Sequence, residues 1–139
     1  MKHASWRYLG VIFLMMAVSW WGNAFSAPPG LTEQTSREGG VTVKVTPQNL
    51  ESGAANWDFE VVLETHTQLL DQDLTKVAAL IDAQGKAHLP LSWEGSPPGG
   101  HHRRGLLRFQ PLVGNPAAVE LRISGVGGTD IRTFRWQLR

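Results

Sequence analysis

The sequence predicts an all-β protein, an immunoglobulin-like antiparallel β-sandwich of about seven strands that follows an N-terminal signal segment. Three observations predict this fold. Short segments with alternating apolar and polar residues follow one another along the chain. Turn signals rich in Gly, Pro and Asn separate them at intervals of roughly ten residues. Helical periodicity is nearly absent after the first segment, and the length of 139 residues suits one small domain.

The N-terminal segment has the order of regions that a secretory signal peptide shows. Lys2 and Arg7 form a basic start, residues 9–18 are apolar, and Ala24 and Ser26 offer small side chains at the −3 and −1 positions of a cleavage site. We therefore expect a signal peptide over residues 1–26 and a periplasmic or secreted protein. The alternative is an uncleaved membrane anchor. The apolar run is shorter than the about 20 residues that span a bilayer, so we expect no stable membrane insertion after cleavage.

The rest of the chain divides into a flexible lead-in over residues 27–40 and a β-sandwich domain over residues 41–139. The lead-in is polar, with Pro and Gly at its ends. Residues 41–46 alternate strictly, with valines on one face, which predicts a half-buried strand. Residues 57–63 form the clearest strand, because large apolar side chains share one face and mostly charged ones share the other.

The middle of the chain contains an ambiguous stretch and a predicted hairpin. In residues 67–76, Asp73 could cap a short helical turn. The apolar residues 77–81 and the segment 88–93 then flank a turn at Gly85, which predicts a hairpin. Pro90, which lies in the second arm, cannot donate to a strand ladder, so we expect an edge or a bulge there.

Three further strands are expected over residues 106–109, 117–124 and 131–138, with Gly- and Pro-containing turns between them. The predicted inward faces carry large aromatic side chains, enough for a small two-layer core: Trp57, Phe59, Phe109 and Trp136.

The densest concentration of reactive side chains lies in residues 93–109, WEGSPPGGHHRRGLLRF. Two adjacent histidines follow a Gly-Gly pair, and imidazole is a common ligand of Cu²⁺ and Zn²⁺. Neighbouring side chains of an extended chain point to opposite sides, but the glycines allow a turn. A second source of ligands follows the strand at residues 57–63. The candidate metal ligands are therefore His101, His102, His66, Asp71 and Asp73. The other interpretation is that the histidines hydrogen-bond within their own loop and brace it.

The arginine pair next to the histidines is a candidate anion site, because a guanidinium group matches a carboxylate or phosphate. The simpler interpretation is an exposed pair that contacts nearby acidic residues. Trp93 and Phe109 flank the loop, and they either belong to the core or line a shallow pocket. The candidate ligand-binding residues are Arg103, Arg104 and Trp93.

Composition and motifs exclude several classes of function. Lys2 and Arg7 account for two of the 13 basic residues, so residues 27–139 hold 11 basic and 12 acidic side chains and a net charge of −1. This charge gives no footprint for nucleic acid. The absence of cysteine excludes disulfides, thiolate metal sites and a cysteine nucleophile. There is no G-x-S-x-G, H-E-x-x-H or phosphate-loop motif, so we do not expect an enzyme.

The pattern W-E-G, G-G-H-H-R and G-x-L-x-F within residues 93–109 resembles one found in small uncharacterised exported β-sandwich domains of bacteria and archaea. Those domains also have a strand that ends in a Thr-His pair, like Thr65-His66, followed by acidic residues like Asp71 and Asp73. The resemblance implies that the two histidine regions belong to one module. It brings no established activity.

We therefore expect an exported, non-catalytic binding or accessory domain that acts through loops at one end of the sandwich. Its expected partner is an exported or membrane protein. The alternative is a periplasmic domain that handles copper or zinc with the His101/His102 loop and His66. The sequence leaves the ligand, the partner and the oligomeric state open.

Overall fold

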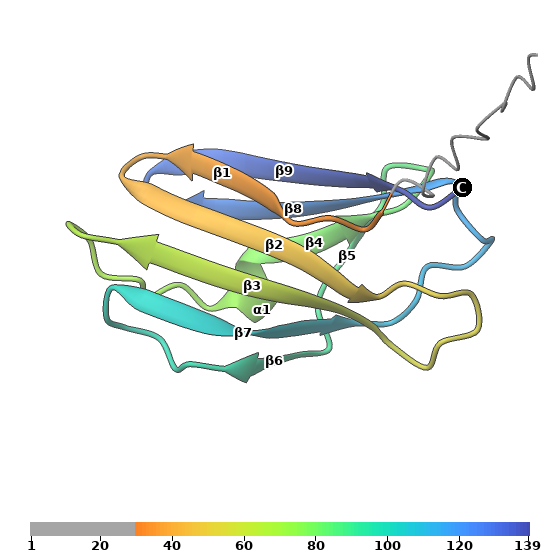
Figure 1. Cartoon of the computed structure of the whole chain (residues 1–139), viewed down its shortest axis with the longest axis horizontal. Helices are drawn as coiled ribbons and strands as arrows, with labels where there is room; N and C mark the ends of the chain where they lie inside the picture. The colour runs from red at the N-terminus through yellow and green to blue at the C-terminus, as the bar shows by residue number, and fades with distance from the viewer. Residues whose placement is uncertain (1–29) are drawn as a thin grey trace, which may run out of the picture.

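The computed structural model describes residues 30–139, which form two antiparallel β-sheets packed face to face (Figure 1). One sheet has the strand order β1-β2-β3-β7-β6 and the other β5-β4-β8-β9. The predicted all-β sandwich is confirmed. The elements are β1 (Gln34–Glu38), β2 (Val41–Asn49), β3 (Trp57–Thr65), α1 (Leu74–Val77), β4 (Ala78–Ile81), β5 (Ala87–His88), β6 (Ser92–Gly95), β7 (His102–Phe109), β8 (Ala118–Val126) and β9 (Thr129–Gln137).

The strand order is that of an immunoglobulin-like domain with one added strand. Strands β2, β3, β7 and β6 take the places of A, B, E and D in one sheet. Strands β5, β4, β8 and β9 take the places of C′, C, F and G in the other. Strand β1 lies outside this set, at the free edge of β2.

The core lies between the sheets, on the faces that the sequence alternation predicts. All four predicted inward aromatic residues are at most 3% exposed. Phe59 occupies the centre. Its ring centroid lies 5.7 Å from that of Phe109 in an edge-to-face arrangement and 5.6 Å from that of Trp136. Full burial of a side chain such as Phe contributes about 1.5–3 kcal/mol, so this aromatic cluster couples the two sheets strongly.

Two expectations about the strands need correction. Part of the expected flexible lead-in, residues 34–38, is strand β1, which pairs with β2. It lacks an apolar alternation because it is an edge strand held by backbone bonds, so periodicity gave no signal. The expected hairpin arm over residues 88–93 is split. Strand β5 ends at His88, and the chain crosses at Pro90 to the other sheet, where β6 pairs with β7.

The turns and loops gather at two ends of the sandwich (Figure 1). What we call the loop end consists of residues 39–40, 66–73, 96–101 and 127–128, on the left of Figure 1. The opposite end, which we call the terminal end, holds the β2–β3 loop, the β4–β5 turn, the β7–β8 loop and the C-terminus.

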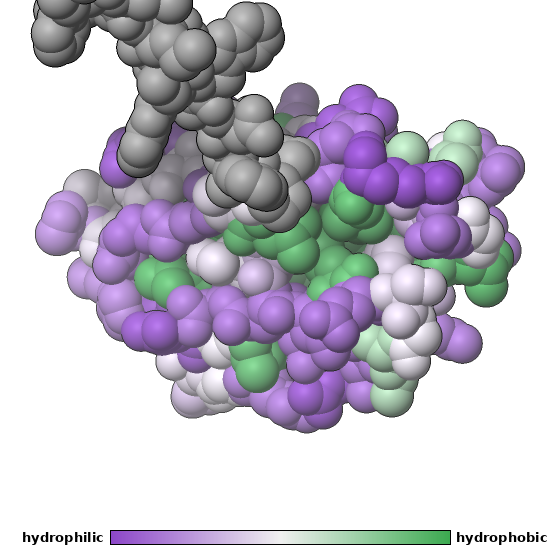
Figure 2. Space-filling view, turned by 45° about the vertical axis from the view of Figure 1, so that its right-hand side comes forward, coloured by the Kyte–Doolittle hydropathy of each residue, from purple (hydrophilic) through white to green (hydrophobic). Residues whose placement is uncertain are grey.

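The terminal end carries apolar surface. Turned to bring this end forward, the space-filling view shows hydrophobic side chains in the middle, with hydrophilic ones around them (Figure 2). One hollow there has a volume of about 460 Å³ and includes Leu31, Leu50, Trp57 and Leu138 in its lining. The expected signal segment, residues 1–26, lies outside the described residues. Within residues 30–139 no helix is long and apolar enough to cross a membrane.

Candidate functional site: the loop end

Arg103 organises the loop end from inside the protein. It is only 1% exposed, although it lies within the GGHHRRG sequence that reads as a polar loop. Its Nη1 donates to the carbonyl oxygens of Leu70 at 3.2 Å and Gln72 at 2.8 Å. Its Nη2 donates to the carbonyl oxygen of Ser96 at 3.5 Å. One guanidinium group therefore joins the β3–α1 loop to the β6–β7 loop.

The aromatic and glycine residues of the 93–109 motif support this arginine. The Cζ atom of Arg103 lies 5.6 Å from the centre of the Trp93 ring, a cation–π geometry. The Trp93 indole also donates to the Ser96 carbonyl oxygen at 2.8 Å. Gly95 and Gly105 pair directly across β6 and β7. A Cβ on Gly105 would lie 2.6 Å from the Glu94 carbonyl oxygen, so a larger residue would push the strands apart.

The charge of Arg103 is held in a partly desolvated place. Burial lowers the pKa of Arg103, and the negative charges of Asp73 and Asp71 oppose that effect. Its Nε–H has no partner among the described residues. The two aspartates therefore act on Arg103 through their charge, because the guanidinium hydrogen bonds go to carbonyl oxygens.

A second buried arginine, Arg132 on β9, closes the same end from the other sheet. It is 1% exposed, and its Nη1 donates to the hydroxyl of Ser36 at 2.9 Å and the carbonyl oxygen of Val41 at 3.1 Å. Its Nη2 donates to the carbonyl oxygens of Glu38 at 2.7 Å and Val126 at 3.0 Å. Arg132 therefore ties the β1–β2 turn to the end of β8.

Side chains between these two arginines complete the connection. The Thr65 hydroxyl donates to the Gly40 carbonyl oxygen at 2.8 Å, and the Gln68 amide donates to the Gly39 carbonyl oxygen. The Gln72 amide donates to the Gly125 carbonyl oxygen at 3.4 Å. Hydrogen bonds thus join the β1–β2 turn, the β3–α1 loop, the β6–β7 loop and the end of β8.

The two histidine-bearing segments lie side by side, as a shared site would require. The Thr65 amide donates to the His101 carbonyl oxygen at 3.0 Å, and the Leu70 amide donates to the Gly100 carbonyl oxygen at 3.0 Å. The side chains of His66 and His101 are exposed. Within residues 30–139 no three His, Asp or Glu side chains gather as a metal-binding group.

The remaining candidate ligands have other partners. The His102 Nδ1 atom lies 3.5 Å from Glu64 Oε1 on the outer face of the sheet. Asp73 caps α1, as predicted: its carboxylate accepts from the Thr75 amide at 3.0 Å and from the Thr75 hydroxyl at 2.7 Å. These bonds from Thr75 lower the pKa of Asp73, with the hydroxyl bond the larger cause. Asp71 is exposed.

The arginine pair is separated by the sheet. Arg103 points into the core, whereas Arg104 points to the outer face and donates to Glu60 Oε2 through Nη2 at 2.8 Å and Nε at 3.2 Å. Trp93 is partly buried and packs against the core. The structure therefore does not bring the two guanidinium groups together as one anion site, and Arg103 and Trp93 are used internally.

The sequence did contain a signal for both buried arginines. Arg103 alternates with Leu107 and Phe109 on the inward face of β7, and Arg132 alternates with Phe134 and Trp136 on that of β9. Period-two alternation places both side chains inside. The general rule that arginine is exposed masks this signal in both strands.

In comparisons with known proteins, no family model, no curated protein and no solved structure matches the chain.

Proposed function

We propose that this protein is an exported, non-catalytic binding or accessory domain that binds a protein partner through its loop end. The observation that supports this function is the burial of Arg103, which fixes two loops from within. Loops that are ordered before binding lose less conformational entropy when a partner docks. The proposal places the chain among the small exported β-sandwich domains that its GGHHR pattern resembles.

The exposed chemistry of the loop end suits a protein partner in the exported fraction or at a membrane. Leu69 is 60% exposed on the β3–α1 loop, although the loop around it is hydrogen-bonded. His66 and His101 lie exposed on the two loops that Arg103 joins. A rigid apolar side chain with adaptable polar neighbours is a common way to form a contact in a protein interface.

Two leucines of nearly equal exposure provide the test. Leu69 (60% exposed) lies at the loop end, and Leu89 (62% exposed) lies between β5 and β6. Pull-down from the exported fraction should recover a partner with the wild type and with Leu89→Ser, and lose it with Leu69→Ser. Equal recovery with all three proteins would place the interface elsewhere. Recovery of no partner by the wild type would reject the proposal.

A metal-handling domain is the second candidate, supported by the contact between the two histidine-bearing loops. His66 and His101 are exposed on adjacent segments, and imidazole nitrogen suits Cu²⁺ and Zn²⁺. Calorimetric titration of the apo protein with Cu²⁺ or Zn²⁺ at pH 7 tests this function. The double variant His101→Ala/His102→Ala should lose the binding, and equal binding by this variant would reject a metal site on the loop.

A further inference from the structure

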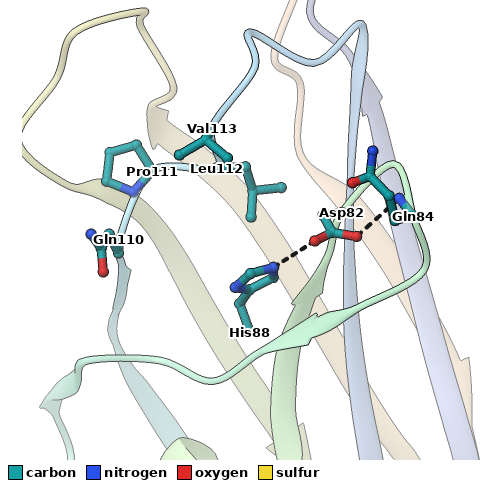
Figure 3. Close-up of a pocket in the computed structure, with 7 residues that line it drawn as sticks. All are labelled: Asp82, Gln84, His88, Gln110, Pro111, Leu112 and Val113. Atoms are coloured by element: carbon teal, nitrogen blue, oxygen red, sulfur yellow. Dashed lines mark hydrogen bonds and ion pairs between the residues drawn. The ribbon is translucent and has the colours of Figure 1, made fainter.

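A second hollow lies at the terminal end, away from the loop end, between the β4–β5 turn and the β7–β8 loop (Figure 3). Its volume is about 220 Å³. One wall carries Asp82, Gln84 and His88, and the other runs over residues 110–113. Ligand pockets for drug-sized molecules measure about 300–1,000 Å³, so this hollow suits a smaller group.

The histidine in this hollow is held in a fixed orientation. His88 Nε2 lies 2.8 Å from Asp82 Oδ2. The other carboxylate oxygen, Oδ1, accepts from the amides of Gln84 at 3.0 Å and Lys86 at 2.9 Å. These bonds, the one from His88 being the largest cause, lower the pKa of Asp82. The turn therefore anchors the carboxylate, and the carboxylate anchors the imidazole.

This arrangement determines which nitrogen of His88 is free. An ionised carboxylate can only accept hydrogen bonds, so the proton of the neutral imidazole is on Nε2. Nδ1 is then an acceptor. In Figure 3 the ring nitrogen that is not bonded to Asp82 points away from it, toward the side of the hollow where Gln110 and Pro111 stand. A ligand in the hollow can therefore donate an N–H to His88.

The rest of the lining combines apolar surface with free amide groups. Pro111 and Leu112 supply an apolar wall. The side-chain amides of Gln84 and Gln110 make no hydrogen bond to another residue in the part of the chain that the structure describes. Another glutamine of this protein shows how such a side-chain amide can bind an extended backbone. Gln34 pairs with the β9 backbone at Arg135, donating to its carbonyl oxygen and accepting from its amide at 3.1 Å.

We propose that the hollow around Asp82 and His88 binds one aliphatic residue of an uncharged, extended peptide segment. The peptide N–H donates to His88 Nδ1, the Gln84 and Gln110 amides pair with flanking peptide groups, and the aliphatic side chain packs on the wall at Pro111 and Leu112. With His88 neutral, the lining carries the single negative charge of Asp82, which disfavours an anionic ligand. The carboxylate oxygens already accept hydrogen bonds from His88, Gln84 and Lys86, so they are not free to pair with a cationic group, and an uncharged ligand fits best. This site is separate from the loop end, so it goes beyond the function proposed above.

The probe for this site is N-acetyl-leucinamide, titrated into the purified protein and followed by ¹H–¹⁵N NMR. The amide shifts should concentrate in residues 84–88 and 110–113, with a Kd on the order of millimolar. N-acetyl-aspartate, which carries negative charge, should bind at least tenfold more weakly. Shifts spread over the whole surface, or equal binding of the charged compound, would overturn the proposal.

Two histidines that each pair with a carboxylate provide matched variants. His88→Ala should weaken binding at least tenfold, whereas His102→Ala, which removes the partner of Glu64 at the other end, should leave binding unchanged. Should His88→Ala disturb the fold, Gln110→Ala decides. Gln110 is exposed, and its truncation should weaken binding about threefold. Unchanged affinity in Gln110→Ala or in a folded His88→Ala protein would overturn the proposal.

Discussion

Replacing Arg103 by methionine removes the guanidinium group and keeps a side chain that fills much of its space. The effect depends on which carbonyl oxygens lose their donor. The Leu70 carbonyl oxygen also accepts from the Gly99 amide at 2.7 Å, and that of Ser96 also accepts from the Trp93 indole at 2.8 Å. The Gln72 carbonyl oxygen, in contrast, accepts a hydrogen bond from Arg103 alone among residues 30–139. The substitution therefore leaves one carbonyl group without a hydrogen-bond donor rather than three.

The expected loss of stability follows from the one carbonyl group left without a donor and from the lost contact with Trp93. A carbonyl left without a donor in a buried position costs about 1–3 kcal/mol, and loss of the contact with the Trp93 ring costs about 0.5–1 kcal/mol more. Removal of a buried charge with an unpartnered Nε acts in the opposite direction. We expect Arg103→Met to lower the free energy of unfolding by about 2 kcal/mol. For a domain of this size that lowers Tm by about 8 °C.

The neighbouring residue supplies the control. The Arg104 side chain is 63% exposed and pairs with Glu60 at the surface, where ion pairs contribute about 0.2–1 kcal/mol. Arg104→Met should therefore cost about 0.5 kcal/mol. Urea unfolding measures both values. Hydrogen exchange should also show faster exchange of the Leu70 and Gly99 amides in Arg103→Met but not in Arg104→Met, because these amides hold the two joined loops together.

Equal destabilisation by the two substitutions would refute this account. So would an Arg103→Met protein whose Leu70 and Gly99 amides exchange at the wild-type rate, because the guanidinium group would then not hold the loops.

Three further predictions test other parts of the fold. Arg132→Met should cost about 3 kcal/mol in urea unfolding, because it removes a charged donor from the buried carbonyl oxygens of Val41 and Val126; a loss below about 1 kcal/mol would contradict this. Gly105→Ala should cost about 1–3 kcal/mol through overpacking against β6, and a wild-type Tm would show that β6 shifts freely. Hydrogen bonds lower the pKa of Asp82 below its ordinary value of 3.8, so its ionised carboxylate stabilises the fold above that pH. This contribution is lost as the pH falls through the lower folded value. Asp82→Asn should therefore flatten the acid limb of the stability curve below about pH 4, and an unchanged limb would contradict the contribution of these hydrogen bonds.

The fold could be predicted from the sequence because apolar and polar residues alternate along the core strands. Alternation in β2 and β3 puts the apolar side chains on the buried face, with Val62 as the exception in β3. Alternation did not predict strand β1, because its five residues are polar and its pairing depends on the backbone of β2. Alternation also did not predict that the chain crosses to the other sheet at Pro90, because the pattern of apolar and polar residues runs on through a change of sheet.

The sequence named the segments of the candidate site but not the residue that joins them. The resemblance implied that the two histidine regions belong to one module, and in the structure the Thr65 amide donates to the His101 carbonyl oxygen. The sequence did not indicate that Arg103 holds these regions together. That assignment needs the tertiary structure, because the acceptors are backbone carbonyl oxygens whose positions no sequence pattern specifies.

Arg103 and Arg132 occupy core positions where an apolar side chain is usual. A buried guanidinium group costs desolvation energy, and an apolar side chain of similar size would often stabilise a core as well or better. What methionine or leucine cannot do is satisfy several carbonyl oxygens of different loops at once. Arg103 and Arg132 both lie at the loop end, come from opposite sheets and donate to carbonyl groups of four separate segments. Their placement is therefore explained better by the shape they impose on the loops than by stability, and a fixed loop shape matters most where a partner binds.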